Sequence, residues 1–416
     1  MRNIIIKYSR LIILAISLLC IFAGLGYKEH LINDISMKQP DKRWSSKELK
    51  AGYVAAYFSE NDGLSEDDVT DFKHTYDSDL KSDSFESNGK NRLYVEAYST
   101  EGEIEVTKKL GGKTVKVNVT ALGGDYFMFH PMQLLYGNYI SGNDLMKDGV
   151  VLDENAAWHL YGSSDIVGRY VYINNESYYV TGVVKGPSGR AARKTYGGKD
   201  HIYMHFSKFA KSGAGGTGVS VANAGGTGVS VANAGGTGVS AANAGGTGVD
   251  GANENGTKIT CYEVLFPDMI NNYAYNKIKN ALGISSENGD SANGSSSDAT
   301  DSFIGISGKS SVYSYGGSDR DLEIINMSRR FKTASLWQVL KSYGRRSMKT
   351  TGIKYPYWEN ECRMTEDFAS LTLIWNGFFG IVLILTLIGP AVNIGRGIKH
   401  TTGRIIKKIK YKFAFK

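Results

Sequence analysis

Cysteine is scarce in this sequence, which has Cys20, Cys261 and Cys362 in 416 residues. So few thiols exclude a disulfide-rich scaffold, which needs several bridges. Cys20 lies in an apolar segment, so the one disulfide that the sequence allows would join Cys261 to Cys362. A single disulfide and two free thiols are both open at this stage.

Charge is absent from two long apolar segments, residues 11–27 and 371–395. A helix needs about 20 apolar residues to cross a bilayer, so each segment predicts a transmembrane helix. The first segment could instead be a cleaved signal peptide, because Gly24-Leu25-Gly26 places small residues at its end. A lipoprotein signal is not favoured, since Leu19 before Cys20 is too bulky.

Acidic residues are absent from the outer flanks of both segments. Residues 1–10 carry three cations and residues 396–416 carry eight, whereas the whole chain has a net charge of +7. The positive-inside rule therefore predicts cytoplasmic residues 1–10 and 396–416, with residues 28–370 exported. The tail alternates isoleucines with lysines at near-helical spacing, which suits either simple anchoring or docking to a cytoplasmic protein. The overall basicity thus reflects topology and does not indicate nucleic acid as a partner.

Motifs that carry catalysis are missing. Residues 186–195, GPSGRAARKT, resemble a phosphate-binding loop, but Ser188 and Arg193 stand where that loop needs glycine, so we expect a solvated basic loop. No serine lies in a Gly-x-Ser-x-Gly elbow, and no Cys and His form a recognisable protease pattern. We therefore expect no enzyme, and we assign no catalytic or cofactor-binding residue.

Two groups of residues could be considered as metal ligands. His201 and His205 flank the strand-like sequence Ile-Tyr-Met, and four residues of strand at about 3.3 Å each separate them by roughly 13 Å. Bystander histidines are favoured over a zinc site, which also needs a third ligand. An acidic cluster could attract calcium, but a solvated first helical turn explains it more simply: Glu66, Asp67, Asp68 and Asp71. We assign no metal ligand.

The region between the apolar segments predicts an α+β domain of mixed sheets with packed helices. Alternating or apolar runs predict strands at 51–59, 92–99, 103–109, 113–122, 150–152, 201–206 and 258–266, and a hairpin over 169–184. Helices are predicted from Ser65 to about residue 80, after the cap Asp153 until Gly162, over 267–283 and from residue 331 onward. Residues 356–370 predict a helical stalk that leads into the second apolar segment.

Low-complexity sequence interrupts the domain at two places. Residues 213–256 hold four copies of a decapeptide, AGGTGVSVAN in its first form, and residues 285–302 are a polar linker. A calcium-binding β-roll would need an aspartate in each copy, and only the last copy has one, Asp250. A flexible or weakly structured insertion that expanded by slippage is favoured, because Gly, Ala, Ser and Asn bury too little apolar area to fold.

A run of about 67 residues, from Asn118 to Val184, resembles the MacB-like periplasmic core domain of ABC-transporter permeases of the MacB/FtsX type. The matching features follow in a distinctive order: Gly-Asp-Tyr-Phe at 124–127, Gly-Asn-Tyr-Ile at 137–140, a Val-Val-Leu strand, a short helix ending in Leu-Tyr-Gly, Asp-Ile-Val-Gly, and a hairpin ending in Val-x-Gly-Val-Val. In this interpretation Asp153, Gly162 and Gly168 shape the backbone and catalyse nothing.

The resemblance implies an extracytoplasmic module in the plasma membrane of a bacterium. It would couple the motion of membrane helices to export or to an envelope partner, with ATP used by a separate ABC ATPase and no cofactor in this chain. The usual permease has four spans and this chain predicts two, so further permease chains are expected as partners beside the lipid bilayer. The alternative is a membrane-anchored binding or sensor protein that works without an ATPase.

Overall fold

The computed structural model describes most of the chain. The described residues are 2–35, 38–46, 50–83, 92–142, 144–187, 190–212, 256–268, 272–283, 313–315, 321–347 and 352–414. The four decapeptide repeats and the polar linker 285–302 lie outside these ranges.

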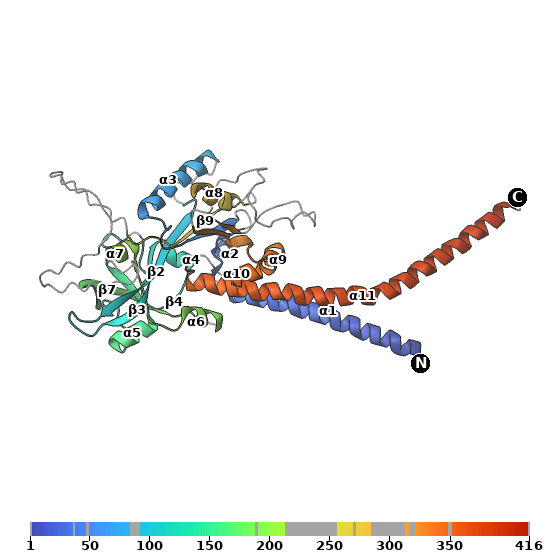
Figure 1. The fold of residues 1–416 in the computed structure, drawn as a ribbon, viewed down its shortest axis with the longest axis horizontal. Coiled ribbons are helices and arrows are strands. Elements are labelled where there is room, and N and C mark those ends of the chain that lie inside the picture. Colours follow the sequence, from blue (N-terminus) through green and yellow to red (C-terminus); the bar gives the residue numbers. More distant parts are fainter. Residues whose placement is uncertain are drawn as a thin grey trace, which may run out of the picture.

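One mixed sheet of 11 strands forms the centre of the described domain (Figure 1). The strands are β1 (Ala51–Phe58), β2 (Val95–Thr107), β3 (Val115–Gly124), β4 (Gln133–Gly137), β5 (Gly149–Asp153), β6 (Tyr170–Ile173), β7 (Glu176–Lys185), β8 (His201–His205), β9 (Cys261–Pro267), β10 (Tyr313–Tyr315) and β11 (Leu322–Asn326). Their order is β10-β11-β1-β9-β2-β3-β8-β5-β7-β4, and β6 pairs with both β2 and β7. The β3–β8 and β5–β7 pairs are parallel, and the other pairs are antiparallel.

Helices cover both faces of this sheet. They are α1 (Arg2–Asp34), α2 (Pro40–Trp44), α3 (Glu66–Ser82), α4 (Tyr126–Phe129), α5 (Glu154–Tyr161), α6 (Arg190–Tyr196), α7 (Phe206–Lys211), α8 (Tyr273–Ala281), α9 (Thr333–Lys341), α10 (Tyr343–Ser347) and α11 (Tyr357–Ala414), with a 3₁₀ turn, η2, at Met327–Arg329. The arrangement confirms the predicted α+β class of mixed sheet and packed helices.

The central strands are buried on both faces, which explains their composition. In β1 every residue after Ala51 is buried, and the strand reads AGYVAAYF with small alanines beside large tyrosines. Val54 and Ala56 face a core that includes residues of α3, α5, α7 and α8, whereas Tyr53 and Ala55 face a core that includes residues of α4, α6 and the start of α11. A strand with two buried faces needs a continuous apolar run, because neither face can remain in water.

Several local predictions are confirmed. Ser65 and Asp68 form the capping box that starts α3. Asp153 caps α5 by accepting from Ala156 N at 2.8 Å, and Gly162 ends this helix in the left-handed conformation at φ 70°. The hairpin of β6 and β7 also forms, with its turn at Asn174 and Asn175.

Other local predictions are wrong. The strands predicted at 92–99 and 103–109 form one strand, β2, because β3 pairs with it continuously through the polar stretch between them. The helix predicted over 267–283 begins only at Tyr273, since Pro267 ends β9 as a partner of Ala51. Strands β4 and β11 were not foreseen, and each depends on a partner that is distant in sequence.

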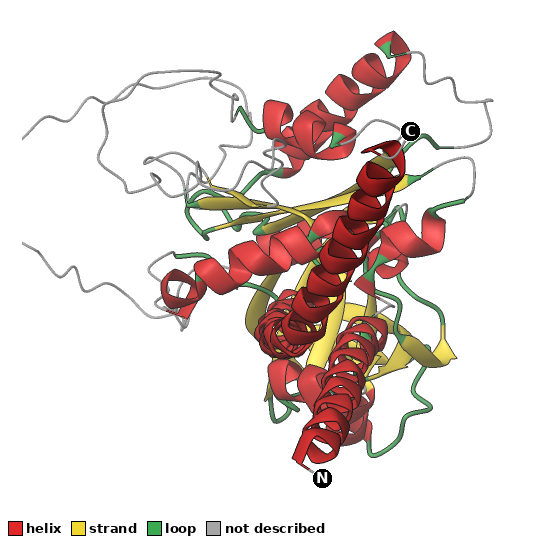
Figure 2. Cartoon of the chain, turned by 90° about the vertical axis from the view of Figure 1, so that its right-hand side faces the viewer, coloured by secondary structure: helices red, strands yellow, loops and turns green. Residues whose placement is uncertain are grey.

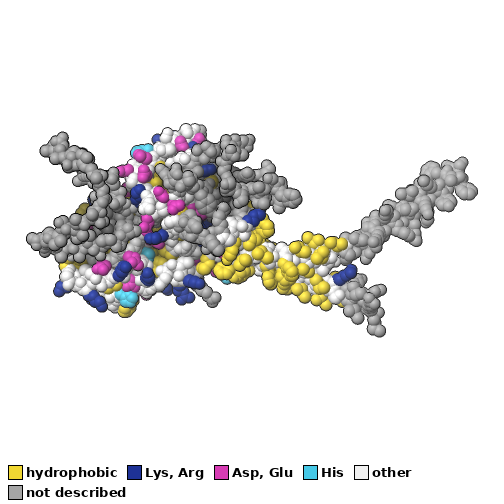
Figure 3. Space-filling view, viewed as in Figure 1, with side chains coloured by type: hydrophobic (Ala, Val, Ile, Leu, Met, Phe, Trp, Pro, Cys, Tyr) yellow, Lys and Arg dark blue, Asp and Glu magenta, His cyan; other side chains and the backbone are white. Residues whose placement is uncertain are grey.

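Two long helices leave the same side of the domain and lie side by side (Figures 1 and 2). Among the described residues, Tyr8–Asp34 of α1 and Tyr357–Ile388 of α11 are long and apolar enough to cross a membrane. Figure 3 shows the hydrophobic side chains gathered along this pair, outside the domain. Beyond the paired part, α11 continues as a helix to Ala414 and diverges from α1 (Figure 1).

Candidate functional site

The first turns of α11 are built into the core of the domain before the helix reaches its apolar segment. Tyr357 and Trp358 are buried against the same face of the sheet as Tyr53 and Tyr57. Polar residues that follow, between Glu359 and Asp367, meet charged partners on β11, directly after η2 and on α10. We call this set of contacts the stalk joint.

Arg330, just after η2, is the centre of the stalk joint. Its guanidinium donates to both oxygens of Glu359, at 2.7 and 3.0 Å, and to Glu366 Oε1 at 2.8 Å. The Arg330 side chain is only 1% exposed, and both carboxylates are 0% exposed. Burial lowers the pKa of Arg330, but the two carboxylates outweigh it and raise that pKa well above its usual value. Arg330 is therefore a permanent cation that α11 neutralises.

A second arginine, Arg363, ties α11 to the sheet. Its Nη2 donates to Glu323 Oε2 of β11 at 2.6 Å, and its Nε donates to Glu359 Oε1 at 2.9 Å. Its guanidinium also lies over the Tyr355 ring, 3.7 Å from the centroid. Because Glu359 receives both Arg330 and Arg363, one carboxylate links the helix, the sheet and the 3₁₀ turn.

A third arginine fastens α10 at the outer end of the stalk joint. Arg346 Nη2 lies 3.0 Å from Glu366 Oε2 and 3.4 Å from Asp367 Oδ1. Glu366 therefore receives one arginine from each end of the segment that contains α9. This arrangement holds α9 and α10 against α11.

A polar triad under the first turn of α11 extends the joint into the centre of the sheet. Glu263 of β9 accepts from Tyr53 Oη, and its Oε2 lies 2.7 Å from His130 Nε2. All three side chains are buried. The His130 ring lies 4.3 Å from the Trp358 ring, centroid to centroid, so α4 and α11 are packed together over this triad.

The end of α1 is tied to the same place. Lys38 forms an ion pair with Glu361 of α11. Arg43 of α2 donates to the carbonyls of Met128 and Phe129, at 2.8 and 3.1 Å. Both long helices are therefore fixed to one region of the domain.

Along their apolar parts, α1 and α11 pack closely through small and polar residues. Trp375 Nε1 donates to the Cys20 carbonyl at 3.1 Å. A Cβ added at Gly24 would lie 2.2 Å from Asn376 Oδ1 and 2.9 Å from Trp375 Cδ1. Glycine permits this approach because it has no side chain, as is common where membrane helices pack.

The stalk joint suits mechanical coupling better than chemistry. The charged groups at its centre, Arg330, Glu359 and Glu366, are engaged by opposite charges and buried. Breaking one partner of such a buried network costs about 3–5 kcal/mol, because it leaves a charge without compensation. The two helices and the sheet are thus expected to move as one body.

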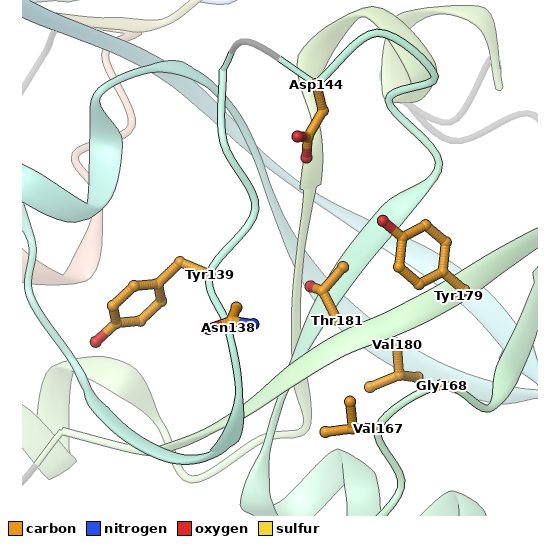
Figure 4. Close-up of a pocket in the computed structure, with 8 residues that line it drawn as sticks. All are labelled: Asn138, Tyr139, Asp144, Val167, Gly168, Tyr179, Val180 and Thr181. Carbon is orange, nitrogen blue, oxygen red and sulfur yellow. The ribbon is translucent and has the colours of Figure 1, made fainter.

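The domain also has a separate open pocket of about 320 Å³ near β7 (Figure 4). It is lined by Asn138, Tyr139, Asp144, Val167, Gly168, Tyr179, Val180 and Thr181. Gly182 lets the chain after β4 pass over β7, because a Cβ there would lie 2.3 Å from the Asn138 carbonyl oxygen. In the part of the chain that the structure describes, no group of three His, Cys, Asp or Glu side chains is placed to hold a metal ion.

Comparison with known proteins decides the family. The family model of the MacB-like periplasmic core domain matches residues 12–244, which is more than half of the chain. The chain belongs to the MacB-like periplasmic core domain family. Members of this family are transporter permease-like proteins, and MacB/FtsX-like members work with ABC ATPase partners.

Two solved structures are similar to this member of the MacB-like family. The periplasmic region of MacB from Actinobacillus actinomycetemcomitans is 15% identical with a TM-score of 0.31, and the match covers 56% of this chain and 84% of that chain. The extracellular domain of YknZ, a noncanonic ABC-type transporter from Gram-positive bacteria, is 11% identical with a TM-score of 0.33, with coverages of 56% and 91%. No curated protein matches the chain.

The two histidines that were considered as metal ligands have different partners in this MacB-like domain. His201 Nε2 lies 2.7 Å from Thr120 Oγ1, and burial lowers the pKa of His201 to about 3. His205 Nε2 lies 3.6 Å from Asp144 Oδ2. Both residues are on β8, as predicted, so the structure does not bring them together.

Two residues of the acidic group at the start of α3 have structural partners. Asp68 completes the capping box, and Glu66 Oε1 accepts from Tyr98 Oη at 2.9 Å.

The predicted basic loop over 186–195 is wrong in part, since Arg190–Tyr196 forms the helix α6. Its C-terminal residue, Tyr196, is buried against the sheet, and this tertiary contact explains why the segment is helical.

Cys261 and Cys362 are free thiols in the structure, and both are buried. Burial raises the pKa of Cys261 well above its usual value, so this thiol remains protonated and unreactive. The sequence had left a disulfide and two free thiols open, and the structure contains the thiols.

Sequence reasoning did not identify the residues of the stalk joint. The sequence predicts a helical stalk over residues 356–370, and within it Glu359, Arg363 and Glu366 lie at positions i, i+4 and i+7. That spacing places three charged side chains on one face of a helix, directly before an apolar run. These charged residues share one helix face next to an apolar run, and this pattern is the sequence signal for a buried ion-pair network.

Proposed function

We propose that this protein is a permease-like subunit of an ABC-transporter system of the MacB/FtsX type. In this proposal the domain is extracytoplasmic and converts motion of α1 and α11 into export or into the handling of an envelope partner. The chain transmits motion and catalyses no reaction, and a separate ATPase hydrolyses the ATP. Family membership supports the class of protein, and the stalk joint supports its mode of action.

The observation that carries the proposal is the buried network around Arg330. A binding domain that only needs an anchor can be connected by a flexible linker, which transmits no force. Here the first turns of α11 enter the core directly, and ion pairs with Arg330 and Glu323 fix this helix to the domain. Lys38, which follows α1, pairs with Glu361 of α11. Movement of the helices in the membrane would therefore reach the sheet without being absorbed by a linker.

We further propose a topology with both termini in the cytoplasm of a bacterial cell. Residues 11–27 and 371–395 would cross the plasma membrane, residues 28–370 would be extracytoplasmic, and residues 1–10 and 396–416 would be cytoplasmic. The cations in both cytoplasmic segments and the lack of acids there support this orientation.

The chain offers two candidate spans, whereas the usual permease of this type has four. The proposal therefore includes further permease chains beside the ATPase. The apolar surface of the paired helices supports this, because side chains such as Phe378 and Leu385 are 61% and 63% exposed outside the α1–α11 contact. Lipid and additional membrane helices both suit such a surface.

Co-purification tests the proposal. The full chain is extracted from its native membranes in mild detergent, and an ABC ATPase together with a further permease chain is expected to accompany it. The extracted chain alone, with no ATPase, would contradict the proposal. Arg330→Met provides a comparison, because it is expected to retain the partners through the spans while weakening the joint.

A membrane-anchored binding or sensor protein is the second candidate. The observation that favours it is the open pocket, where Asn138, Asp144 and Thr181 offer polar groups to a ligand. The same extraction separates the two candidates, since a sensor would be recovered without an ATPase.

A further inference from the structure

Two exposed aromatic side chains lie on α9 and α10, close to the paired helices. Trp337 and Tyr343 are each 47% exposed, whereas Leu336 and Val339 of α9 are buried. The two helices lie on the side of the domain from which α1 and α11 leave (Figure 1). Single exposed hydrophobic residues are normal on protein surfaces, so exposure alone does not indicate a binding surface. The position of these two residues relative to the apolar helices is the informative observation.

The position of α10 along α11 is known from its ion pairs. Arg346 of α10 contacts Glu366 and Asp367. The next residue, Phe368, is 49% exposed and begins the apolar surface that continues to Ile388. At 1.5 Å per residue these 20 steps measure about 30 Å, the thickness of the hydrocarbon core of a bilayer. Arg346 therefore lies at the boundary of the membrane.

The other long helix places the boundary at the same height. The contacts of Cys20 with Trp375 and of Lys38 with Glu361 show that α1 and α11 run in opposite directions. Between these two contacts, the apolar part of α1 ends at Lys28 and Glu29. Both helices thus change from apolar to charged beside α10.

The side chains on α9 and α10 are of the kinds that membrane surfaces select. Trp and Tyr concentrate where headgroups meet hydrocarbon, because each combines an apolar ring with a polar group. Figure 3 shows hydrophobic side chains continuing from the paired helices onto the adjoining part of the domain. The aromatic pair is on helices that Arg346 fastens to α11 at the start of this apolar surface.

We propose that α9 and α10 form a membrane-surface anchor, with Trp337 and Tyr343 in the headgroup region of the leaflet on the side of the domain. The partner is the lipid surface itself. Because Arg330 and Arg346 fasten this segment to Glu366, the anchor would fix the height and tilt of α11 relative to the bilayer. The inference rests on the two spans and is independent of the ATPase partnership.

Depth-dependent quenching in nanodiscs tests the anchor on the full chain. Cys20→Ala leaves two cysteines, and both are buried, so a cysteine introduced at position 337 can be labelled alone with an environment-sensitive fluorophore. The quenchers are iodide in the water and phosphatidylcholine that carries a nitroxide near its headgroup. Trp158→Cys is the matched control, since Trp158 is 55% exposed on α5. Phe378→Cys reports on the span.

The label in Trp337→Cys is expected to lose most of its emission to the nitroxide lipid and little to iodide, and the label in Trp158→Cys is expected to do the reverse. The anchor would be overturned if the nitroxide lipid quenched the labels in Trp337→Cys and Trp158→Cys equally while it quenched the label in Phe378→Cys strongly. That result would leave the spans intact. Lack of lipid quenching at 378 would overturn the spans and the anchor together. Protection of 337 from iodide in native membranes but not in nanodiscs would assign the surface to a protein partner and also overturn the proposal.

Discussion

Arg330 and Glu359 form a doubly hydrogen-bonded ion pair inside the domain, with Nη1–Oε2 and Nη2–Oε1 distances of 2.7 and 3.0 Å. Glu359 is on the helix that continues into the second apolar segment, and Arg330 follows a strand of the central sheet. The pair therefore connects the two parts of the protein that must move together if the domain is to respond to the membrane.

Arg330→Met should lower the free energy of unfolding by about 3–5 kcal/mol, because Glu359 and Glu366 would remain buried without their main cation. Chemical denaturation of the detergent-solubilised chain measures the change. Lys354→Ala is the control, since it removes an exposed pair with Glu60 that contributes at most about 1 kcal/mol. Equal effects of the two substitutions would show that the Arg330 network does not stabilise the domain.

Gly24→Val should weaken the contact between α1 and α11. The new side chain would overlap Asn376 and Trp375, and overpacking of this kind costs about 1–3 kcal/mol. Gly26→Val is the matched control, because no atom lies within 4 Å of a Cβ added at Gly26. The thermal unfolding midpoint in detergent measures both, and a midpoint for Gly24→Val equal to that of Gly26→Val would contradict the close approach.

His201 should make the domain sensitive to acid. Its pKa is lowered by burial from 6.5 to about 3, so between these values the unfolded chain binds a proton that the folded chain does not. The free energy of unfolding therefore falls as pH decreases through this window, by about 1.4 kcal/mol per pH unit at most.

Asp153 acts in the opposite direction. Burial raises its pKa to about 6, so between pH 6 and about 3.8 the folded chain binds the extra proton and stability rises on acidification.

His201→Gln removes the contribution of His201 and leaves that of Asp153. The variant should therefore gain stability relative to the parent as pH falls below 6.5, measured by denaturation at a series of pH values. Parallel pH profiles of parent and variant would exclude this role for His201.

Gly162→Val should reduce the amount of folded protein at the membrane. Gly162 has φ 70°, and no atom lies within 4 Å of an added Cβ, so the cost is the left-handed backbone itself, about 1–2 kcal/mol. Gly162→Asn should cost less, because asparagine tolerates this conformation. Normal abundance of Gly162→Val with selectively lost activity would show that the position belongs to a site.

The fold was predictable where local signals agree with tertiary structure. Asp153 and Gly162 bound α5 because a cap and a left-handed terminus act over a few residues, and β6 and β7 pair through an adjacent turn. Strand β11 was not predictable, since its register is set by β1, more than 260 residues earlier. The break expected within β2 failed for the same reason, as pairing with β3 overrides local polarity.

The stalk joint was hidden because charged residues before an apolar segment usually lie in water. Whether Glu359 is solvated or buried depends on Arg330 and Arg363, and only the packing of α11 on the sheet brings these residues together. The family resemblance does not reveal the joint, since the segment that carries it, from Asn118 to Val184, excludes the three arginines of the joint and the carboxylates that they contact.

The distance between the domain and the second helix tests the account most directly. Spin labels at Trp158→Cys on α5 and Ile381→Cys on α11, in a Cys20→Ala chain reconstituted in nanodiscs, report this distance by pulsed electron paramagnetic resonance. Rigid coupling through the stalk joint predicts one narrow distance population, which broadens when Arg330→Met is added. A broad population that Arg330→Met leaves unchanged would contradict rigid coupling through the stalk joint.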